Sequence, residues 1–484
     1  MEFKISKSNA FIFSFGIIVF SYVTIKASIS SFTHDESFSY LHYIQKSFMD
    51  IITFSDWYTN NHVLNSLLMK YSEKLFGNSE VALRLPNLLL FIVYMSYSFL
   101  LFKRSNKIIL MSMFAVLCTN NSIIDLFGLA RGYGLSIGFM TMSIYHFIQS
   151  FYSQKAQQVF LFHFSSLLAI LSSFILVDVY LALLITYVVM TFIDCKYFSN
   201  QKYHLLISNK VHLIPFLVLV IILYEPIRRV ALNSDLNFGG KIGLYSDTLS
   251  YLTSYAVHGT HFSSIEFSSI KIIFSCIVLI TTILIIKMII KRDKIFWEKY
   301  KNLVVLNLLI WVITIEISLQ HIIFNADYPI GRFSLFILPI YIFQFGFLLS
   351  FIGDYYKNAV LTVSISLAII SCLSFVSKAD FYSCSEWEYD METRNMMQLL
   401  SEYHSKYDAN STNVRIGINS FYEPTINFYR ITKNISWLLP ADRNGLLISD
   451  SYYYCKKEEL DQLKLSNYKI IANFDRIKML LVKK

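Results

Sequence analysis

Charge is scarce in this chain. Only 15% of its 484 residues are Asp, Glu, Lys or Arg, whereas 55% are hydrophobic and the mean hydropathy is +0.49. An aqueous globule of this length could not bury so much apolar surface. The shortage of charge therefore excludes a soluble protein and predicts an integral membrane protein.

Metal-site cysteines, repeats and a cleavage signal are also missing. The six cysteines lack the spacing of a metal site, and the chain has no internal repeat, low-complexity linker or coiled coil. The first apolar run lacks a convincing small-residue cleavage site, so we expect it to remain as a membrane helix. Cys384 and Cys455 share the C-terminal tail, and a disulfide between them is left open because a sequence does not give their distance.

Long apolar runs are what the chain has in abundance. A run of about 18 residues is long enough to cross a bilayer as a helix. The runs predict about eleven spans, the third of them short, near residues 9–31, 85–102, 107–120, 131–151, 158–176, 178–194, 212–231, 269–290, 303–323, 333–352 and 358–377. The predicted fold class is an all-α polytopic membrane protein.

Basic residues are unevenly divided between the two sides of these spans. With the N-terminus in the cytoplasm, where it carries Lys4 and Lys7, the inner segments hold fifteen Lys and Arg residues and the longer outer segments hold nine. This is the positive-inside bias of membrane proteins. The odd number of spans then places the C-terminus outside, and the expected location is the bacterial plasma (inner) membrane.

The last part of the chain differs from the rest. From Asp380 onward it holds 14 basic and 14 acidic residues, so the net charge of +9 belongs to residues 1–379. Topology and anionic lipid explain that charge without a nucleic-acid partner. Residues 380–484 are predicted to form a small extracytoplasmic α/β domain, with strands near 414–418, 435–439, 446–449, 468–474 and 479–482 and helices near 386–406, 423–430 and 456–465.

Two adjacent carboxylates stand at a predicted membrane boundary. Asp35 and Glu36 directly follow the first span, where charge is costly unless it has a function. The predicted topology puts them on the outer face, away from ATP and nucleotide sugars. Acidic residues also cap helices from the N-terminal end, so a purely structural role is the alternative.

Two outer loops, near 33–83 and 225–268, are long enough to form structure of their own. In the first, Phe38, Leu41, Ile44 and Phe48 are spaced as on one face of a helix. This spacing predicts an amphipathic helix that lies along the membrane interface directly after the acidic pair.

Several segments occur in an order that resembles a known family. The Asp-Glu pair is followed by Asn60-Asn61-His62-Val63-Leu64-Asn65 and by the stretch from Leu75 to Asn87. Later come Ala130-Arg131-Gly132-Tyr133-Gly134-Leu135 and Tyr328-Pro329-Ile330-Gly331-Arg332-Phe333. This order resembles the membrane glycosyltransferases of the GT-C fold, in particular the protein O-mannosyltransferase and lipid A aminoarabinose transferase group. Many relatives have prolines where this chain has Val63 and Leu64, so donor and acceptor details do not carry over.

The resemblance implies a hexosyl- or pentosyltransferase. Such an enzyme moves a sugar, with inversion, from a polyprenyl-phosphate donor to a lipid, glycan or protein acceptor at the outer face of the membrane. Asp35 is then the expected base for the attacking group, with Glu36 orienting Asp35 or the acceptor. No cofactor is implied, and a divalent metal is not supported because the acidic pair lacks a convergent set of ligands.

Cations must balance the charge that grows on the leaving lipid phosphate, and arginine suits that geometry. Arg131 and Arg332 are the first choices, although either could be an ordinary residue of the membrane interface. The weaker expectations are donor-phosphate contacts from His62, Arg228, Arg229 and Lys241, and supporting carboxylates at Asp125 and Glu316. A lone histidine is more often a structural hydrogen bonder, and Glu316, in mid-span, is as compatible with a pair between helices as with a carrier groove.

Two other classes of function stay open. A transporter or flippase for lipid-linked saccharides predicts paired interrupted helices or an internal repeat, and the sequence has neither. A polysaccharide polymerase or non-catalytic assembly component also handles lipid-linked sugars at the outer face. Against that reading, the acidic site here follows the first span instead of lying in a large later loop.

Overall fold

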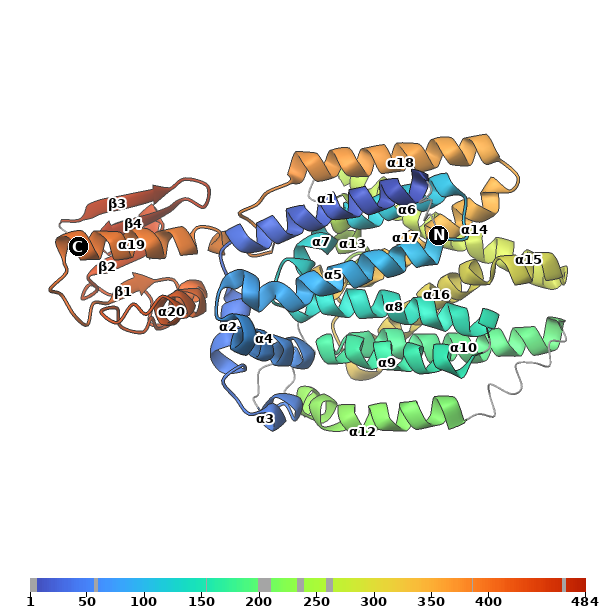
Figure 1. The fold of residues 1–484 in the computed structure, drawn as a ribbon, viewed down its shortest axis with the longest axis horizontal. Coiled ribbons are helices and arrows are strands. Elements are labelled where there is room, and N and C mark those ends of the chain that lie inside the picture. Colours follow the sequence, from blue (N-terminus) through green and yellow to red (C-terminus); the bar gives the residue numbers. More distant parts are fainter. Residues whose placement is uncertain are drawn as a thin grey trace, which may run out of the picture.

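The computed structural model describes residues 7–55, 60–153, 155–198, 210–232, 239–257, 264–384, 386–463 and 467–484. It consists of a bundle of long helices and a small tail domain that lies at one end of the bundle (Figure 1). Lys4 of the predicted inner charges and residues 464 and 465 of a predicted tail helix lie outside the described residues. The bundle contains α1 (Lys7–Ile29), α4 (Val63–Phe76), α5 (Glu80–Phe102), α6 (Lys107–Cys118), α7 (Asn121–Phe127), α8 (Gly132–Ser153), α9 (Ala156–Ser172), α10 (Leu176–Phe198), α12 (Lys210–Leu232), α13 (Thr248–Val257), α14 (Ser264–Ile290), α15 (Lys294–Lys299), α16 (Lys301–Phe324), α17 (Ile337–Gly353) and α18 (Lys357–Lys378).

A helix occupies each of the eleven predicted spans. Within the described residues, six helices are long and apolar enough to cross a membrane, namely α1, α5, α10, α14, α16 and α18. Taken together, α6 and α7 are also long and apolar enough for one span, with a bend of 64° between the two helices. Other helices of the bundle do not meet these criteria; α9 and α17, for example, are too short, with 17 residues each. Length and apolarity alone therefore give up to seven of the eleven predicted spans.

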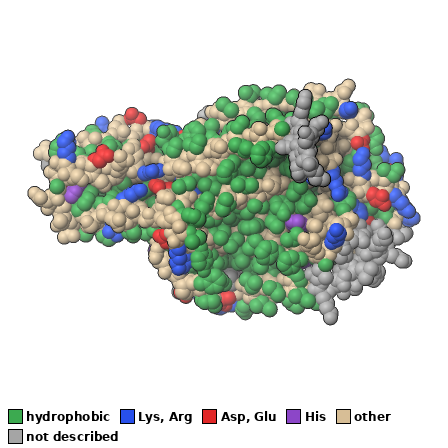
Figure 2. Space-filling model, viewed as in Figure 1, with side chains coloured by type: hydrophobic (Ala, Val, Ile, Leu, Met, Phe, Trp, Pro, Cys, Tyr) green, Lys and Arg blue, Asp and Glu red, His purple; other side chains and the backbone are tan. Residues whose placement is uncertain are grey.

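The surface of the bundle is apolar. Figure 2 shows hydrophobic side chains over a broad area of the helices, with the charged side chains gathered on the tail domain and at the opposite end of the bundle. Phe13, Ile221, Ile283 and Val376 are among the exposed apolar residues, each on a different helix. Such a surface is stable in lipid and not in water. The chain is an integral multi-pass membrane protein, and its orientation in the membrane stays a prediction.

The tail domain is built on a four-stranded sheet in the order β1-β2-β4-β3. The pair β1–β2 is parallel, whereas β4 runs antiparallel to both β2 and β3. The elements are β1 (Ile416–Ile418), β2 (Tyr452–Cys455), β3 (Lys469–Phe474), β4 (Met479–Lys483), α19 (Thr393–Tyr407), α20 (Glu423–Thr432) and α21 (Lys457–Gln462). The predicted small α/β domain is thus present.

Two of the predicted strands are wrong and one strand was missed. Leu438 forms only an isolated bridge to Val414, and residues 446–449 contain a turn instead of a strand. The missed strand, β2, is central and buried along its whole length. A strand buried on both faces has no alternation of polar and apolar residues by which to recognise it.

The tail domain shares an apolar core with the segment that follows α1. The ring of Phe32 stacks on that of Phe428 at 4.2 Å, and Tyr40 meets Phe428 edge-on at 5.0 Å. Helix α2 (His34–His42) therefore lies between the bundle and the tail domain, and the short α3 (Phe48–Ile52) follows it. A helix forms where the amphipathic helix was expected, but it contains the acidic pair and ends at His42, before Ile44 and Phe48. It packs against both the bundle and the tail domain instead of lying along the lipid interface.

The open question of the tail cysteines is answered by their positions. Cys384 packs with Leu129 and Trp387, whereas Cys455 belongs to a separate cluster in the sheet domain. Both are buried and free. They form no disulfide with each other.

Candidate active site

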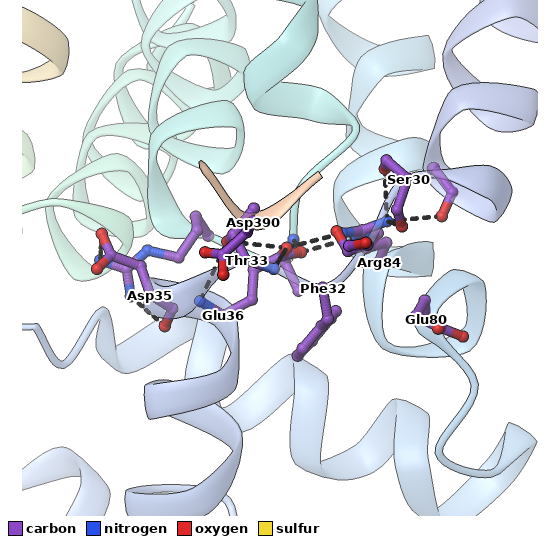
Figure 3. A network of polar contacts seen from close by, with 12 residues as sticks. Ser30, Phe32, Thr33, Asp35, Glu36, Glu80, Arg84 and Asp390 are labelled. Carbon is purple, nitrogen blue, oxygen red and sulfur yellow. Dashed lines mark hydrogen bonds and ion pairs between the residues drawn. The ribbon is translucent and has the colours of Figure 1, made fainter. Parts of the chain in front are cut away.

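The acidic pair lies in the first turn of α2, whose start is fixed by a capping box. Thr33 is the N-cap: its backbone N–H and its hydroxyl donate to Glu36 Oε2 at 2.9 and 3.0 Å, and its Oγ1 accepts the Glu36 N–H at 3.4 Å. Consecutive side chains on a helix point about 100° apart. Figure 3 shows the result: Glu36 faces Arg84, and Asp35 lies on the other side of the turn.

Glu36 and Arg84 form a completely buried ion pair. Arg84 Nε and Nη2 donate to the two carboxylate oxygens of Glu36 at 2.8 and 2.7 Å. Its remaining donors reach backbone carbonyls at the end of α1, from Ala27, Ser30 and Ser31. Because both charges are paired and their hydrogen-bonding capacity is used, Glu36 has a structural role and is not free to meet a substrate. The expectation that it takes a direct part in the chemistry is not supported.

The same pair positions the segment that carries Arg131. The backbone N–H of Ala130 donates to Glu36 Oε1 at 2.6 Å, and the Ala130 carbonyl accepts from Asn65 at 2.8 Å. Asn87 in turn donates to Asn65 at 3.1 Å. The segments that carry the family resemblance in the first loop, in α5 and before α8 thus meet in one hydrogen-bonded network.

One glycine, Gly132, and one proline, Pro86, explain how these segments approach so closely. A Cβ on Gly132 would lie 1.9 Å from the Ser172 carbonyl oxygen and 2.6 Å from the His62 ring, so no larger residue fits. Pro86 cannot donate to the carbonyl of Ala82 one turn earlier in α5. The hydroxyl of Ser72 in α4 donates to that carbonyl instead.

Asp35 lies between two arginines. Its Oδ2 is 3.0 Å from Nη2 of Arg332 and 3.6 Å from Nη2 of Arg131. Within the described residues this oxygen accepts no hydrogen bond, although it is buried. A carboxylate oxygen that is held by two cations and still has acceptor capacity is suited to receive a proton from a bound group.

The two arginines differ in what else they contact. Arg131 is fixed by Ser39 and Asn60 and by the backbone carbonyl of Asp35, and its side chain is 1% exposed. Arg332 is 24% exposed. Of the two predicted phosphate-binding arginines, Arg332 is therefore the one that a ligand can reach. Arg131 is enclosed by protein and lies next to Asp35.

Arg332 contacts residues from three other parts of the chain, namely α2, α8 and the tail segment. It lies in the 3-10 turn Gly331–Phe333 between α16 and α17, after a glycine with φ +57°. Its Nε donates to Tyr133 at 3.0 Å and its Nη1 donates to Glu386 at 3.0 Å. The Trp387 ring centroid is 4.9 Å from the guanidinium carbon. The tail segment thus supplies both a carboxylate and an aromatic face to this arginine.

His62 is buried beside this cluster, and its ring meets that of Tyr133 edge-on at 4.7 Å. Its Nδ1 lies 2.6 Å from the Ser172 carbonyl oxygen, which can only accept, so Nδ1 carries the proton. Burial lowers the pKa of His62 well below its usual range, and the charges of Arg131 and Arg332 lower it further. A neutral ring with its one N–H already used has no donor for a phosphate, so the predicted phosphate contact is not supported.

The other predicted residues stand apart from Asp35. Arg228 and Arg229 pair with Glu225 on their own helix, and Lys241 is exposed. Asp125 pairs with Lys26 at 2.6 Å; it lines a cavity of about 10 Å³, room for about one water, that Arg332 and Glu386 also line. Glu316 is partly buried in α16, and its Oε2 has no hydrogen-bond partner among the described residues. Among the predicted phosphate-binding residues, Arg332 combines contact with Asp35 and partial exposure, and phosphate binding stays a prediction.

Sequence reasoning missed Glu386, Trp387, Arg84 and Asp390. Asp390 of the tail accepts the backbone N–H of His34 at 2.6 Å and so completes the capping of α2. The signal for Glu386 and Trp387 was weak, an acid and an aromatic residue shortly after the last span. Their contact with Arg332 depends on long-range packing, which no local pattern records.

Metal binding receives no geometric support. In the parts of the chain that the structure describes, no group of three or more His, Cys, Asp or Glu side chains is placed to hold a metal ion.

Comparison with known proteins gives a match at the level of structure only. No protein-family model matches the chain, and no curated protein matches it by sequence. The crystal structure of ArnT from Cupriavidus metallidurans bound to undecaprenyl phosphate superposes with a TM-score of 0.51 at 10% identity, over 98% of this chain and 97% of that chain. The apo state of the same protein gives a TM-score of 0.49 at the same identity and coverage. The resemblance predicted from the sequence is thus confirmed for the fold, and the chain has the GT-C fold of ArnT.

Proposed function

We propose that this protein is a glycosyltransferase that moves a sugar from a polyprenyl-phosphate donor to an acceptor. One observation carries the proposal: the carboxylate of Asp35 lies between Arg131 and Arg332 at the junction of bundle and tail domain. The ArnT structure with the same fold is described as bound to undecaprenyl phosphate, which supports a lipid phosphate as the carrier.

The chemistry that these groups favour is a displacement at the anomeric carbon. A hydroxyl or phosphate oxygen of the acceptor forms the new bond to that carbon while the bond to the donor phosphate breaks. When the attacking group is a hydroxyl, its proton passes to Asp35 Oδ2. The attack comes from the face opposite the leaving group and inverts the anomeric centre.

Arg332 is the group that stabilises the leaving lipid phosphate. Its planar guanidinium offers paired donors, and its partial exposure allows a ligand to reach them. Its Nη atoms pair with Asp35 and Glu386. A bound phosphate would take over part of these contacts and leave Asp35 free to accept a proton. Arg131, which is buried beside Asp35, keeps that carboxylate in place.

The test is mass spectrometry of lipid-linked sugars and of sugar-modified envelope products in cells. Cells would carry the native chain, no chain, or Asp35→Asn at equal expression, with Asp50→Asn as control because Asp50 is an exposed carboxylate on α3. We expect deletion and Asp35→Asn to accumulate the polyprenyl-phosphate sugar and to lose one glycosylated product, with turnover reduced about 10²- to 10⁴-fold in the variant. An Asp35→Asn chain that behaves like the native one would remove Asp35 from the mechanism.

A further inference from the structure

A second cavity lies at the end of the bundle opposite the tail domain and the Asp35 site. It has a volume of about 940 Å³ and is lined by the adjoining ends of α5, α6, α8, α16, α17 and α18. Figure 1 places these helix ends far from the tail domain, on the side of the N-terminus. The cavity therefore has no part in the chemistry proposed above and needs an explanation of its own.

The charged lining of this cavity is unbalanced. It contains four cations, Lys103, Arg104, Lys299 and Lys357, and two carboxylates, Glu298 and Asp354. Lys299 and the hydroxyl of Tyr300 both donate to Asp354, so that carboxylate is already neutralised. Within the described residues, Lys103, Arg104 and Lys357 form no ion pair. The lining of the cavity thus has two more cations than carboxylates.

Arg104 lines the cavity and is held by an aromatic ring. Its guanidinium carbon lies 5.5 Å from the ring centroid of Tyr152, whose hydroxyl donates to Asn302 at 2.9 Å. This cation–π contact orients the side chain without using the N–H groups. Tyr145 and Tyr152 also line the cavity, and such residues gather where lipid headgroups lie.

Another part of the lining is apolar, beside polar side chains such as Gln149, Asn302 and Ser350. Leu101, Ile109, Leu303, Phe347 and Val360 are buried side chains on five different helices. A free phosphate would fill only a small part of about 940 Å³ and would leave the apolar part of the lining without a ligand group to pack against. A molecule with an anionic head and an apolar chain satisfies both parts of the lining.

We propose that this cavity binds the phosphate headgroup of an anionic phospholipid, with Arg104 and Lys357 on the phosphate and an acyl chain against the apolar wall. Basic pockets between membrane helices are suited to such headgroups. The inference is independent of the proposed glycosyltransferase activity, because the two sites share no residue.

Native mass spectrometry of the full-length protein in detergent tests the proposal. The probes are phosphatidylglycerol, phosphatidylcholine with the same acyl chains, and inorganic phosphate. We expect phosphatidylglycerol to bind about tenfold or more tightly than phosphatidylcholine. The variant Arg104→Gln with Lys357→Gln should lose that preference. The four residues are all exposed, but Lys107 and Lys294 do not line the cavity, so the control Lys107→Gln with Lys294→Gln removes the same charge from the same end and should retain the preference.

The outcomes that would overturn the proposal are separate from those that test the activity. Equal binding of the two lipids by the native chain would exclude an anionic headgroup site and requires no variant. Equal loss in the control variant would show general surface attraction. Displacement of phosphatidylglycerol by millimolar inorganic phosphate, with equal stabilisation by phosphate alone, would assign the site to a free anion instead of a lipid.

Discussion

Asp35 and Glu36 are neighbours in sequence, but the structure gives them opposite environments. Glu36 is closed in with Arg84, whereas Asp35 faces the accessible Arg332. We expect Glu36→Gln to lower the free energy of unfolding by about 3–5 kcal/mol, because it leaves a buried arginine without its counter-charge. Unfolding in detergent followed against temperature or denaturant measures this loss. Asp35→Asn, the comparison, should lose less, because Asp35 lies 3.6 Å from the buried Arg131, which keeps its hydrogen bonds to Ser39 and Asn60; equal loss in both variants would contradict the division of roles.

Arg332 is the residue on which recognition of the donor phosphate depends in our proposal. Arg332→Gln should reduce the rate of product formation about 10²- to 10³-fold, the usual effect of removing one group that stabilises developing negative charge. Arg228→Gln is the matched control, since Arg228 was also expected from the sequence to bind phosphate but is exposed and pairs with Glu225. The rate measured in membranes with a lipid-linked donor should be unchanged in the control. A similar loss in both would mean that overall positive charge, and not Arg332, matters.

His62 gives the protein a pH dependence of stability. Burial lowers its pKa in the folded state, so below about pH 6.5 the unfolded chain takes up a proton at this residue that the folded chain does not. The contribution of His62 to the free energy of unfolding is therefore fully present above about pH 6.5. It decreases as the pH falls, by at most about 1.4 kcal/mol per pH unit. Thermal unfolding between pH 7.5 and 5.5 should show a smaller decrease for His62→Gln than for the native chain. An unchanged slope would mean that other groups dominate.

At the scale of elements, helix α2 shows what a sequence can and cannot predict. The spacing of Phe38, Leu41 and Ile44 indicates a helix, and one forms here, although it contains the acidic pair and ends at His42, before Ile44. The same spacing could not show that the tail domain covers the helix, because Asp390 and Phe428 are hundreds of residues away. Periodicity reports which face is apolar, and it does not report whether lipid or protein covers that face.

The same distinction applies to the candidate site. Asp35, Arg131 and Arg332 were all expected from the sequence, and the structure brings them together. Their accessibility was not predictable, since it depends on how Ser39 and Asn60 hold Arg131. Strand β2 was missed for a related reason: a buried run of tyrosines has the composition of a core residue cluster as much as of a strand.

At the scale of the whole molecule, the tail domain forms one wall of the candidate site. Glu386 accepts hydrogen bonds from Arg332 and from Tyr255 of α13, so it links the tail to two parts of the bundle. Without this carboxylate, Arg332 would be drawn towards Asp35 alone. Donor phosphate would then compete with Asp35 for Arg332, and the proton acceptor would stay occupied.

Glu386→Ala should therefore reduce turnover on the order of 10- to 100-fold with little change in unfolding temperature, because a catalytic group displaced by about 1 Å can cost about 10² in rate. Glu386→Gln, which retains an acceptor for Arg332, should recover most of the rate. Glu388→Ala is the control, an exposed acid two residues further along the tail. Rates and unfolding temperatures of the three variants, measured in the full-length protein, separate a positioning role from a structural one. If Glu386→Ala unfolds early and the Gln variant does not restore activity, the tail contributes to stability and not to the placement of Arg332.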